Sequence, residues 1–454
     1  MIPVEGQPIL TAAEMRAAEE HAAPTPDAMY ALMERAGAGV AEAVRRLAAG
    51  AEVLVLCGPG NNGGDGYVAA TALASNGHPV RVAATGEPRT DSARRARAAW
   101  TGPVVPLDRA APAPILVDAL FGTGLTRPLD RAVTGPLNNL TEVARLRIAV
   151  DLPSGVASDD GAVPSEPPRF DLTLALGALK PAHLLQPAAR HAGQVRLLDI
   201  GVPVASRVAA LARPMLPEPG PDAHKFTRGL VAVVSGAMPG AAALAAEAAS
   251  RAGAGYVLLL GDAAAGPHAI VRRHWSTDAL ADPHIGAVVI GPGLGRDEAA
   301  RDRFAVAYNS DHPLVIDGDA LRLLDPDRAR TAPTILTPHA GEFDHLFGPG
   351  EGGKIARTQA AARRSGAVVV FKGADTVVAA PDGRAVVAGS PSHWLSTAGT
   401  GDVLAGSCGA MLASGLDPFD AATAAVWLHG EAARRLGPAF LADDLARALS
   451  AARA

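Results

Sequence analysis

The chain of 454 residues is poor in cysteine, with only Cys57 and Cys408, each in a glycine-rich stretch. Two such cysteines support neither a disulfide framework nor a cysteine metal cluster, so we expect a reducing compartment. No stretch approaches the roughly 20 consecutive apolar residues of a membrane-spanning helix. Residues Met1 to Leu10 lack the positive region and apolar run of a secretory signal. We therefore expect a cytoplasmic protein with no membrane partner.

Positive charge is also scarce. Lysine and arginine number 41 against 46 acidic residues, a formal net charge of −5, so no basic face for nucleic acid is expected. Only four of the basic residues are lysines: Lys180, Lys225, Lys354 and Lys372. A position that keeps lysine in an arginine-rich chain indicates a need for a compact ammonium, as when a point charge meets a phosphate. The alternative is a solvated lysine retained by chance.

Glycine and proline are abundant, at 49 and 37 residues, which is typical of a fold with many connections. The chain is longer than the roughly 250–300 residues at which a single core stops growing, so two domains are expected. Apolar runs alternate with alanine-rich helical segments, a pattern that predicts parallel sheets covered by helices. Periodicity weakens and prolines accumulate between about residues 204 and 223, which predicts a linker there.

The expected elements can be given by residue number. Helices are expected at about 11–20 and 28–48. In the first half, strands are expected near 53–56, 80–84, 115–117, 148–150, 172–176 and 195–199. In the second half, strands are expected near 230–234, 256–260, 287–290, 314–316, 334–336, 368–371 and 376–379. We expect an α/β protein with domains at residues 1–212 and 213–454.

The tract CGPGNNGGDG, residues 57–66, directly follows an apolar run and predicts a strand-to-helix turn. Its glycines allow the backbone to approach an anion, and a helix beginning near Tyr67 would direct free N–H groups at that spot. Two of the chain's six asparagines, Asn61 and Asn62, stand here side by side. The alternative is a glycine-rich turn without a ligand. The tract is longer and less degenerate than a dinucleotide fingerprint, so we interpret it as a phosphate-binding turn.

Two further turns follow predicted strands of the first half. One carries Asp118, two glycines and Arg127; the other carries Asp151 and Ser154. Because open α/β sheets assemble their sites at strand ends, we expect these turns to converge on the first loop. Asn62, Asp118 and Ser154 offer only hard oxygen donors, which suit an alkali or alkaline-earth cation rather than zinc. For either aspartate alone, capping of the following segment is the alternative.

On these residues the first half resembles the epimerase domain of the bacterial bifunctional NAD(P)H-hydrate repair enzymes. The likeness covers roughly residues 1 to 210, through GPGNNGGDG, DALFGTGL, VDLPSG and the tract at 173–180 before Pro181. It implies a Rossmann-like three-layer domain in which Asn62, Asp118 and Ser154 bind K⁺. The residues that it implies for binding the hydrated dinucleotide are Asn61, Asn62, Gly63, Gly64, Asp65, Gly122, Thr123, Gly124, Leu125, Thr126, Arg127, Pro128 and Asp151.

The resemblance also implies that Asp151 acts on the substrate. Epimerising a hydrated nicotinamide at C6 needs an acid–base group beside the ring and donors that grip the phosphates. We expect Asp151 to be the catalytic group, and Asp65 stays open as an alternative.

The second half carries another signature, STAGTGD at residues 396–402, before an apolar stretch of helical length at 403–412. The backbone N–H groups of residues 398–401 could stabilise a transferring phosphoryl group, and Asp402 could accept a proton from the attacking hydroxyl. The alternative is a helix cap in which Asp402 meets only the helix dipole.

Other turns of this half support a nucleotide site. Three follow strands, at 291–295, 337–342 and 372–376, and His224-Lys225 opens the domain. His339 lies on the second of these turns, although a structural histidine is its alternative reading. His429 lies within a helical run at 423–433 and is interpreted as packed or capping.

Together these turns resemble the ribokinase-like fold, specifically the ADP-dependent NAD(P)H-hydrate dehydratase, over about residues 222 to 450. The likeness implies that the hydrate hydroxyl is phosphorylated and that phosphate then leaves. The residues implied for the adenine nucleotide are Lys372, Gly373, Ala374, Asp375, Thr376 and Gly401. The residues implied for the hydrated substrate are Ala254, Gly293, His339 and Asp402, with Asp402 catalytic.

Mg²⁺ is expected with the nucleotide, although no carboxylate cage is visible and Mg²⁺ usually relies on phosphates and waters. Asp317 and Asp319 could contribute through water. Gly318 stands where relatives tend to have alanine, which leaves the role of that turn open.

Two other functional classes are alternatives: an ordinary small-molecule kinase of the ribokinase group, and a non-catalytic scaffold like relatives of the first domain in RNA decay. The intact GNNGGDG loop and the presence of Asp65, Asp118, Asp151 and Ser154 together favour the repair enzyme. We expect NADH and NADPH hydrates as substrates, ADP as co-substrate with ATP as the alternative, and a homo-oligomer. The sequence does not decide which nucleotide or hydrate is preferred, or whether the intermediate passes directly between sites.

Overall fold

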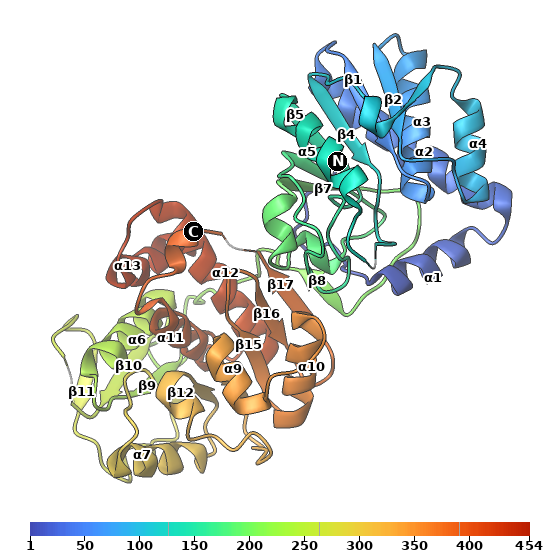
Figure 1. Cartoon of the computed structure of the whole chain (residues 1–454). Coiled ribbons are helices and arrows are strands. Elements are labelled where there is room, and N and C mark those ends of the chain that lie inside the picture. Colours follow the sequence, from blue (N-terminus) through green and yellow to red (C-terminus); the bar gives the residue numbers. More distant parts are fainter. Residues whose placement is uncertain (126, 263, 390) are drawn as a thin grey trace. The chain divides into compact units, whose positions relative to one another are not determined.

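The computed structural model describes residues 1–125, 127–262, 264–389 and 391–454 (Figure 1). The chain divides into two compact units, Met1–Ala210 and Leu211–Ala454. The first contains a parallel sheet and the second a mixed sheet, so the predicted α/β class is confirmed. Among the described helices, none is both long and apolar enough to cross a membrane.

The first unit is built on a sheet of order β3-β2-β1-β4-β5-β6-β7 whose strands are parallel. The strands are β1 (Val53–Cys57), β2 (Val80–Ala84), β3 (Val104–Pro106), β4 (Ile115–Ala119), β5 (Leu146–Val150), β6 (Leu172–Leu176) and β7 (Gln194–Leu198), and β8 (Val208–Ala210) ends the unit. The α-helices are α1 (Ala12–Ala22), α2 (Pro26–Ala48), α3 (Asn61–Ser75), α4 (Asp91–Ala99) and α5 (Arg131–Val143).

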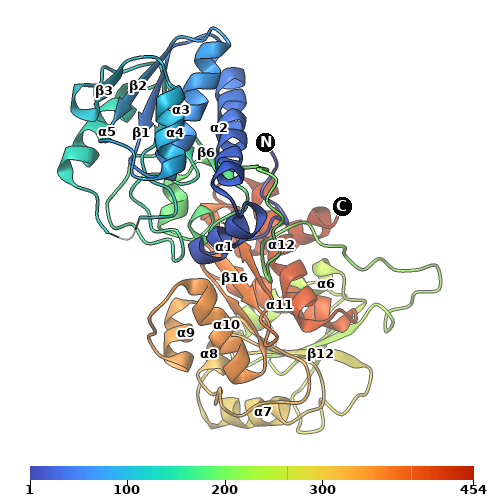
Figure 2. The same cartoon turned by 90° about the vertical axis from the view of Figure 1, so that its right-hand side faces the viewer.

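Helices cover both faces of this sheet because its strands are apolar throughout, as parallel sheets require. In β1, Val53 and Val55 pack in the cluster that contains α2 and α3, whereas Leu54 and Leu56 pack with Leu137 of α5 on the other face. Helices α2, α3 and α4 lie side by side on the first of these faces (Figure 2). The carboxyl ends of the strands therefore meet at one edge, with helix starts beside them.

Helix α3 begins at Asn61, so the predicted start near Tyr67 is wrong. The glycines of the tract serve close packing inside the helix rather than a longer turn. A Cβ on Gly63 would lie 1.9 Å from the Gly58 carbonyl oxygen, and one on Gly66 would lie 2.8 Å from the Ala119 Cβ. The free N–H groups of the helix consequently begin at Asn61, within the predicted dinucleotide loop.

The second unit has a sheet that includes the order β11-β10-β9-β12-β13-β14-β15-β16-β17, parallel up to β15 and antiparallel from β15 to β17. The strands are β9 (Leu230–Val234), β10 (Tyr256–Leu260), β11 (Val271–Arg273), β12 (Ile285–Ile290), β13 (Leu314–Ile316), β14 (Thr334–Leu336), β15 (Val368–Phe371), β16 (Thr376–Ala379) and β17 (Ala385–Ala388). The α-helices are α6 (Pro239–Ala252), α7 (Glu298–Tyr308), α8 (Gly318–Leu321), α9 (Ala340–Phe347), α10 (Lys354–Ser365), α11 (Thr400–Ala413), α12 (Pro418–Leu436) and α13 (Ala442–Ala452).

This sheet is also covered on both faces. Helices α6, α11, α12 and α13 share one buried cluster with Val370 of β15. The next residue, Phe371, points to the other face, because side chains alternate along a strand. There its ring stacks on Phe343 of α9, with centroids 4.1 Å apart, beside Lys354 of α10. The carboxyl ends of β9, β12, β13, β14 and β15 again form one edge, and α11 begins there.

Candidate active sites

In the first unit, Asp118 ties the loop after β4 to the loop after β5. Its Oδ1 accepts hydrogen bonds from Ser154 Oγ (2.8 Å) and Leu120 N (3.1 Å), and its Oδ2 accepts one from Ser154 N (2.9 Å). Burial raises the pKa of Asp118 to about 6, although the hydrogen bonds from Ser154 and Leu120 oppose the shift. The two turns predicted to converge therefore do so.

Asn62 of α3 approaches the same point. Among the described residues, neither its Nδ2 nor its Oδ1 has a hydrogen-bond partner, although both are buried. A Cβ on Gly122 would lie 3.3 Å from Asn62 Cγ, and the preceding Phe121 donates its N–H to Ser154 Oγ (2.9 Å). A buried amide without a partner is expected to have one in the working protein. The oxygen donors of Asn62, Asp118 and Ser154 thus gather around residues 121–122.

Asp151 lies beside this group in a left-handed backbone conformation, with φ of 63°, which is uncommon for a residue with a side chain. Its Oδ1 accepts hydrogen bonds from Lys180 Nζ (2.6 Å) and Leu176 N (3.2 Å). Its Oδ2 lies 3.1 Å from the position of a Cβ on Gly122. One carboxylate oxygen is therefore held by the protein, and the other faces the Gly122 turn.

His183 supports the strained backbone of Asp151. Its Nδ1 accepts a hydrogen bond from Lys180 N (2.8 Å), so its Nε2 carries the proton and donates it to the Asp151 carbonyl oxygen (2.6 Å). Burial, helped by the charge of Lys180, lowers the pKa of His183 to about 4. A neutral histidine with one tautomer thus fixes the residue that we expect to be catalytic.

Two more carboxyl groups, those of Asp65 and Glu19, interact electrostatically with Asp151 and Lys180. Burial, and then the charge of Asp151, raises the pKa of Asp65 in α3 well above its ordinary value. Burial also raises the pKa of Glu19 in α1. A carboxyl group that keeps its proton beside one that is ion-paired is the arrangement of an acid and a base.

The other predicted residues of this unit have varied surroundings. Asn61 is exposed and accepts a hydrogen bond from Thr90 Oγ1 (2.6 Å), and Gly64 packs against Met33. Thr126 lies outside the described residues. Leu125 is buried and Thr123 is half-buried, whereas the exposed members of the turn are Gly124, Arg127 and Pro128.

In the second unit, Asp402 stands in the first turn of α11, next to Gly401 and after the left-handed Gly399. Burial raises the pKa of Asp402 to about 7; Asp317 and Glu342 add to the shift and Lys372 opposes it. Asp402 can therefore take up and release a proton near neutral pH, as a general base must.

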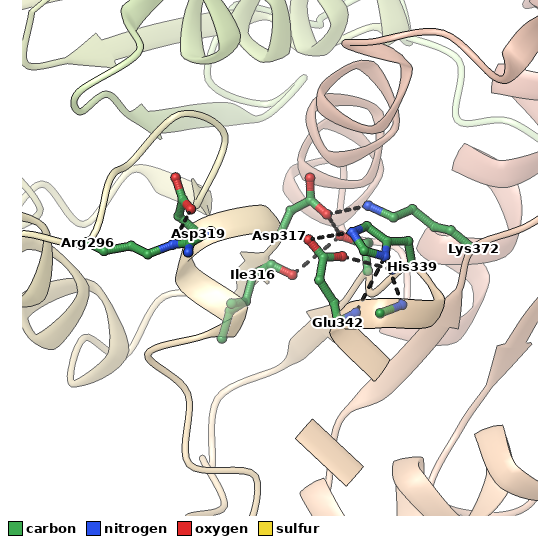
Figure 3. A network of polar contacts seen from close by, with 9 residues as sticks. Arg296, Ile316, Asp317, Asp319, His339, Glu342 and Lys372 are labelled. Carbon is green, nitrogen blue, oxygen red and sulfur yellow. Dashed lines mark hydrogen bonds and ion pairs between the residues drawn. The ribbon is translucent and has the colours of Figure 1, made fainter. Parts of the chain in front are cut away.

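Figure 3 shows a polar network around Asp317 and Lys372. Lys372 Nζ donates to Asp317 Oδ1 (2.6 Å), and Thr337 Oγ1 donates to the same oxygen (2.6 Å). Lys372 Nζ also lies 3.3 Å from the position of a Cβ on Gly401. Burial lowers the pKa of Lys372, but the charges of Asp317, Glu342 and Asp402 and the hydrogen bond to Asp317 together outweigh burial, so the pKa is raised and the ammonium stays charged.

His339 is the N-cap of α9. Its Nδ1 accepts a hydrogen bond from Gly341 N (3.0 Å), and the Glu342 carboxylate accepts one from His339 N (2.8 Å). Its Nε2 lies 3.5 Å from Glu342 Oε1, and the side chain is 59% exposed. Behind α11, His429 Nε2 lies 2.9 Å from the Thr400 carbonyl oxygen, and burial lowers the pKa of His429 to about 4.

Lys354 anchors the predicted nucleotide-binding loop at residues 372–376 through Asp375. Its Nζ donates to the Asp375 carboxylate and to the Asp375 carbonyl oxygen, both at 2.7 Å. Thr376 Oγ1 closes the turn by donating to the Gly373 carbonyl oxygen (3.1 Å), and Gly373 and Ala374 are exposed. The loop thus presents its backbone outward from a fixed base.

Not every predicted residue reaches this edge of the sheet. Gly293 follows β12 with φ of 63° and packs against the Met238 backbone, whereas Ala254 precedes β10 and lies at the opposite, amino end of the strands. His224 and Lys225 precede β9, so they do not join the strand-end turns of the predicted nucleotide site. Lys225 Nζ instead lies 4.8 Å from the centre of the Tyr256 ring.

Both carboxylate oxygens of Asp319 are engaged by the protein, because they accept hydrogen bonds from Gly295 N (3.0 Å) and Arg296 Nε (2.8 Å) (Figure 3). Across the described ranges, no group of three or more histidine, cysteine or acidic side chains is arranged to hold a metal ion. The residues present therefore do not form a Mg²⁺ cage.

Sequence reasoning gave no role to Lys180, His183 or Thr337 and left that of Asp317 open. The rarity of lysine pointed to Lys180, and Asp317 follows a predicted strand. Nothing in the sequence shows that His183 meets Asp151 or that Thr337 meets Asp317, because those contacts join loops that are 32 and 20 residues apart.

Comparisons with known proteins bear on both units. Residues 29–182 match the family described as YjeF-related protein N-terminus, and residues 231–452 match NAD(P)H-hydrate dehydratase. The chain is similar to the bifunctional NAD(P)H-hydrate repair enzyme Nnr of Salinibacter ruber, with 36% identity over 95% of this chain and 92% of that protein. For the enzymes of the same name from Mycobacterium tuberculosis and Escherichia coli, the identities are 37% and 34%, over 86% and 92% of this chain and 86% and 88% of theirs.

Among solved structures, one similar to the chain is the ADP/ATP-dependent NAD(P)H-hydrate dehydratase from Bacillus subtilis, co-crystallised with ATP and Mg²⁺. It is 30% identical, with a TM-score of 0.47, over 52% of this chain and 93% of that one. The sequence relatives, which extend across both units, decide the assignment: the chain belongs to the family of bifunctional NAD(P)H-hydrate repair enzymes.

Proposed function

We propose that this protein repairs hydrated NADH and NADPH. The first domain, residues 1–212, interconverts the R and S hydrates, and the second, residues 213–454, dehydrates the S epimer to NAD(P)H with ADP. The observation that carries the proposal is the match to bifunctional relatives across both units. Each unit also has a buried or half-buried aspartate at the carboxyl edge of its sheet, Asp151 and Asp402.

The first reaction is an exchange of configuration at a carbon that carries both a hydroxyl group and a ring nitrogen. Asp151 Oδ2 takes the hydroxyl proton as a carbonyl forms at C6, and the C6–N1 bond breaks with its electron pair on N1. Asp65 supplies a proton to N1. Closure on the opposite face reverses each transfer and restores both carboxyl groups. The raised pKa of Asp65, caused first by burial, suits it to be the donor.

Asn62, Asp118 and Ser154 would hold K⁺ in this site. A bound K⁺ would supply a fixed positive charge next to the Gly122 turn. The fit rests on the buried, unpartnered amide of Asn62 and on the hard oxygen donors of the other two residues.

The second reaction is a phosphoryl transfer followed by an elimination. Asp402 accepts the hydroxyl proton of the hydrate as the oxygen bonds to the terminal phosphorus of ADP, and the bond from that phosphorus to the bridging oxygen breaks to release AMP. The C6–O bond then breaks with its electron pair on phosphate, the C5 proton passes to water, and the C5–C6 double bond returns. Gly401 and Lys372 stand where N–H donors can stabilise the phosphoryl charge.

The nucleotide would contact Lys372, Gly373, Ala374, Asp375, Thr376 and Gly401. Gly293, His339 and Asp402 remain the proposed contacts of the hydrate. Mg²⁺, for which the described residues form no cage, would rely on the phosphates and on water. The use of ADP, with ATP as the alternative, the homo-oligomer and the cytoplasmic location stay predictions.

The test incubates the purified protein with a mixture of R and S NADPH hydrates, Mg²⁺ and ADP, and follows the recovery of dihydronicotinamide absorbance. Full recovery is expected for the native chain. Asp402→Ala should abolish recovery, whereas Asp151→Ala should leave the S epimer converted quickly and the R epimer only at its spontaneous rate. No recovery with either ADP or ATP would reject the dehydratase and favour a small-molecule kinase of the ribokinase group.

A further inference from the structure

Asp317 is the most tightly engaged acidic residue at the second site, yet the proposed reaction gives it no part. It follows β13, is 3% exposed, and accepts two short hydrogen bonds at Oδ1, from Lys372 Nζ and Thr337 Oγ1, both at 2.6 Å. Its Oδ2 lies 3.9 Å from the position of a Cβ on Gly401. The carboxylate therefore connects β13, β14 and β15 to the first turn of α11.

The partner ammonium sits at the amino end of α11. Lys372 Nζ lies 3.3 Å from the position of a Cβ on Gly401, next to Asp402. An ammonium has three N–H donors, and its bond to Asp317 uses one of them. Two donors remain for phosphate oxygens at a helix end whose own N–H groups also favour an anion. Released from Asp317, the flexible lysine chain would occupy many positions.

We propose that Asp317 is a positioning residue for the dehydratase: its ion pair holds Lys372 Nζ against the first turn of α11, where the ammonium meets the phosphoryl group that is transferred beside Asp402. The inference rests on the proposed dehydratase function. It assigns Asp317 to the lysine rather than to Mg²⁺.

Asp317 and Lys372 shift the pKa of Asp402 in opposite directions. Three charged groups interact with Asp402: Asp317 after β13, Glu342 of α9 and Lys372 after β15. His429 of α12 is neutral near pH 7, because burial lowers its pKa to about 4. Asp317 raises the pKa of Asp402 and Lys372 lowers it. Because Asp402 must be ionised to accept a proton, the acidic limb of the rate profile follows that pKa.

The experiment measures kcat/KM of the full-length protein for the S epimer of NADPH hydrate with ADP across pH. Asp317→Asn should move the acidic limb to lower pH, and Lys372→Met should move it to higher pH. Each should lower kcat on the order of a hundredfold, because the ammonium is misplaced or absent. Thr337→Val, which removes a hydrogen bond to Asp317 without changing charge, should leave the limb where it is.

A single substitution leaves a buried charge unpaired and can prevent folding, so the double variant Asp317→Asn with Lys372→Met completes the set. It has no unpaired charge, and its acidic limb should return toward the native position while kcat stays low. Limbs that move in the same direction in both single variants, or a double variant with native kcat, would overturn the inference. A native chain inactive on the S epimer would instead reject the proposed function.

Discussion

Three of the four lysines in this arginine-rich chain bind a buried aspartate beside a strand end. Lys180 pairs with Asp151 and Lys372 with Asp317, both at 2.6 Å, and Lys354 pairs with Asp375 at 2.7 Å. In each case a single-point ammonium fits a carboxylate within a small polar space, where the planar fork of arginine would need more room. The fourth, Lys225, instead lies over aromatic rings.

Replacement of Lys180 by methionine should affect both stability and function of the first unit. The change leaves the Asp151 carboxylate buried without its counter-charge, which costs about 3–5 kcal/mol when one partner of a buried pair is removed. Denaturant unfolding should show that loss, and epimerisation of the R hydrate should fall to the spontaneous rate. Dehydration of the S hydrate should continue, because Asp402 lies in the other unit.

Lys225→Met is the matched control, since the ammonium of Lys225 is exposed and should contribute within about 0.5 kcal/mol. The double variant Lys180→Met with Asp151→Leu should regain stability but not epimerase activity. Unchanged epimerisation in Lys180→Met would contradict the role given to the pair.

Asp402 should give the dehydratase an acidic limb near pH 7. Burial and the charges of Asp317 and Glu342 raise the pKa of Asp402 to about 7, so below that pH the rate should fall about tenfold per pH unit. A pH profile of kcat/KM on the S epimer checks this. A limb at about pH 4, the range of an ordinary carboxyl group, would show that the rate depends on another group.

The raised pKa of Asp402 also makes the stability of the second unit depend on pH. The folded state holds the Asp402 proton more tightly than the unfolded chain, so the free energy of unfolding that Asp402 contributes falls as pH rises from about 4 to about 7. Asp402→Asn should therefore remove dehydratase activity and yet stabilise the second unit at pH 8. A destabilised Asp402→Asn variant at that pH would contradict the burial argument.

At the scale of the element, strands were predicted well and the glycine-rich helix start was not. Strands such as β2, β6 and β9 match their predicted ranges because buried parallel strands are continuous apolar runs. The strands β3, β8, β11 and β17 were missed. Of these, β3 and β11 are half-buried or exposed, so they lack the continuous apolar run that revealed equally short strands such as β13 and β14. Helix α3 was predicted too short, because the glycines that serve packing resemble those of a turn.

Gly63, which is closely packed, and Gly60, which is not, lie in the same tract, so the two kinds of glycine can be compared there. In Gly63→Ala the new Cβ would lie 1.9 Å from a backbone oxygen that cannot move aside, so the first unit should lose about 1–3 kcal/mol and most epimerase activity. Gly60→Ala is the matched control: its Cβ meets nothing within 4 Å and its φ of −96° suits alanine. Thermal unfolding and the R-hydrate assay should separate the two, and equal effects would show that the tract acts only as a flexible turn.

At the scale of the whole molecule, the sequence predicted two α/β units and the loops of each site, but not the contacts that complete the sites. Asn62, Asp118 and Ser154 could be grouped from the sequence because all three lie at strand or helix ends on one edge, and their role as a K⁺ site stays a prediction. Ala254 follows no strand, so its assignment came from resemblance alone, and the structure locates it at the other end of β10. Long-range partners such as Lys180 for Asp151 depend on how loops fold over the edge, which no local pattern records.

Because the proposed catalytic aspartate of each site and the charged groups beside it belong to a single unit, two full-length variants that each lack one activity should complement each other in solution. Asp402→Asn keeps the epimerase and Asp151→Asn keeps the dehydratase, so neither alone should repair the R hydrate at an enzymatic rate. Mixed in equal amounts with ADP, they should restore NADPH from R hydrate, since the S epimer released by one variant can bind the other. The rate should rise with total protein concentration, as expected for a freely diffusing intermediate. The mixture of native protein with either variant serves as the control for inhibition. A mixture no faster than its separate components, while each retains its own single activity, would mean that the S epimer passes between sites without release.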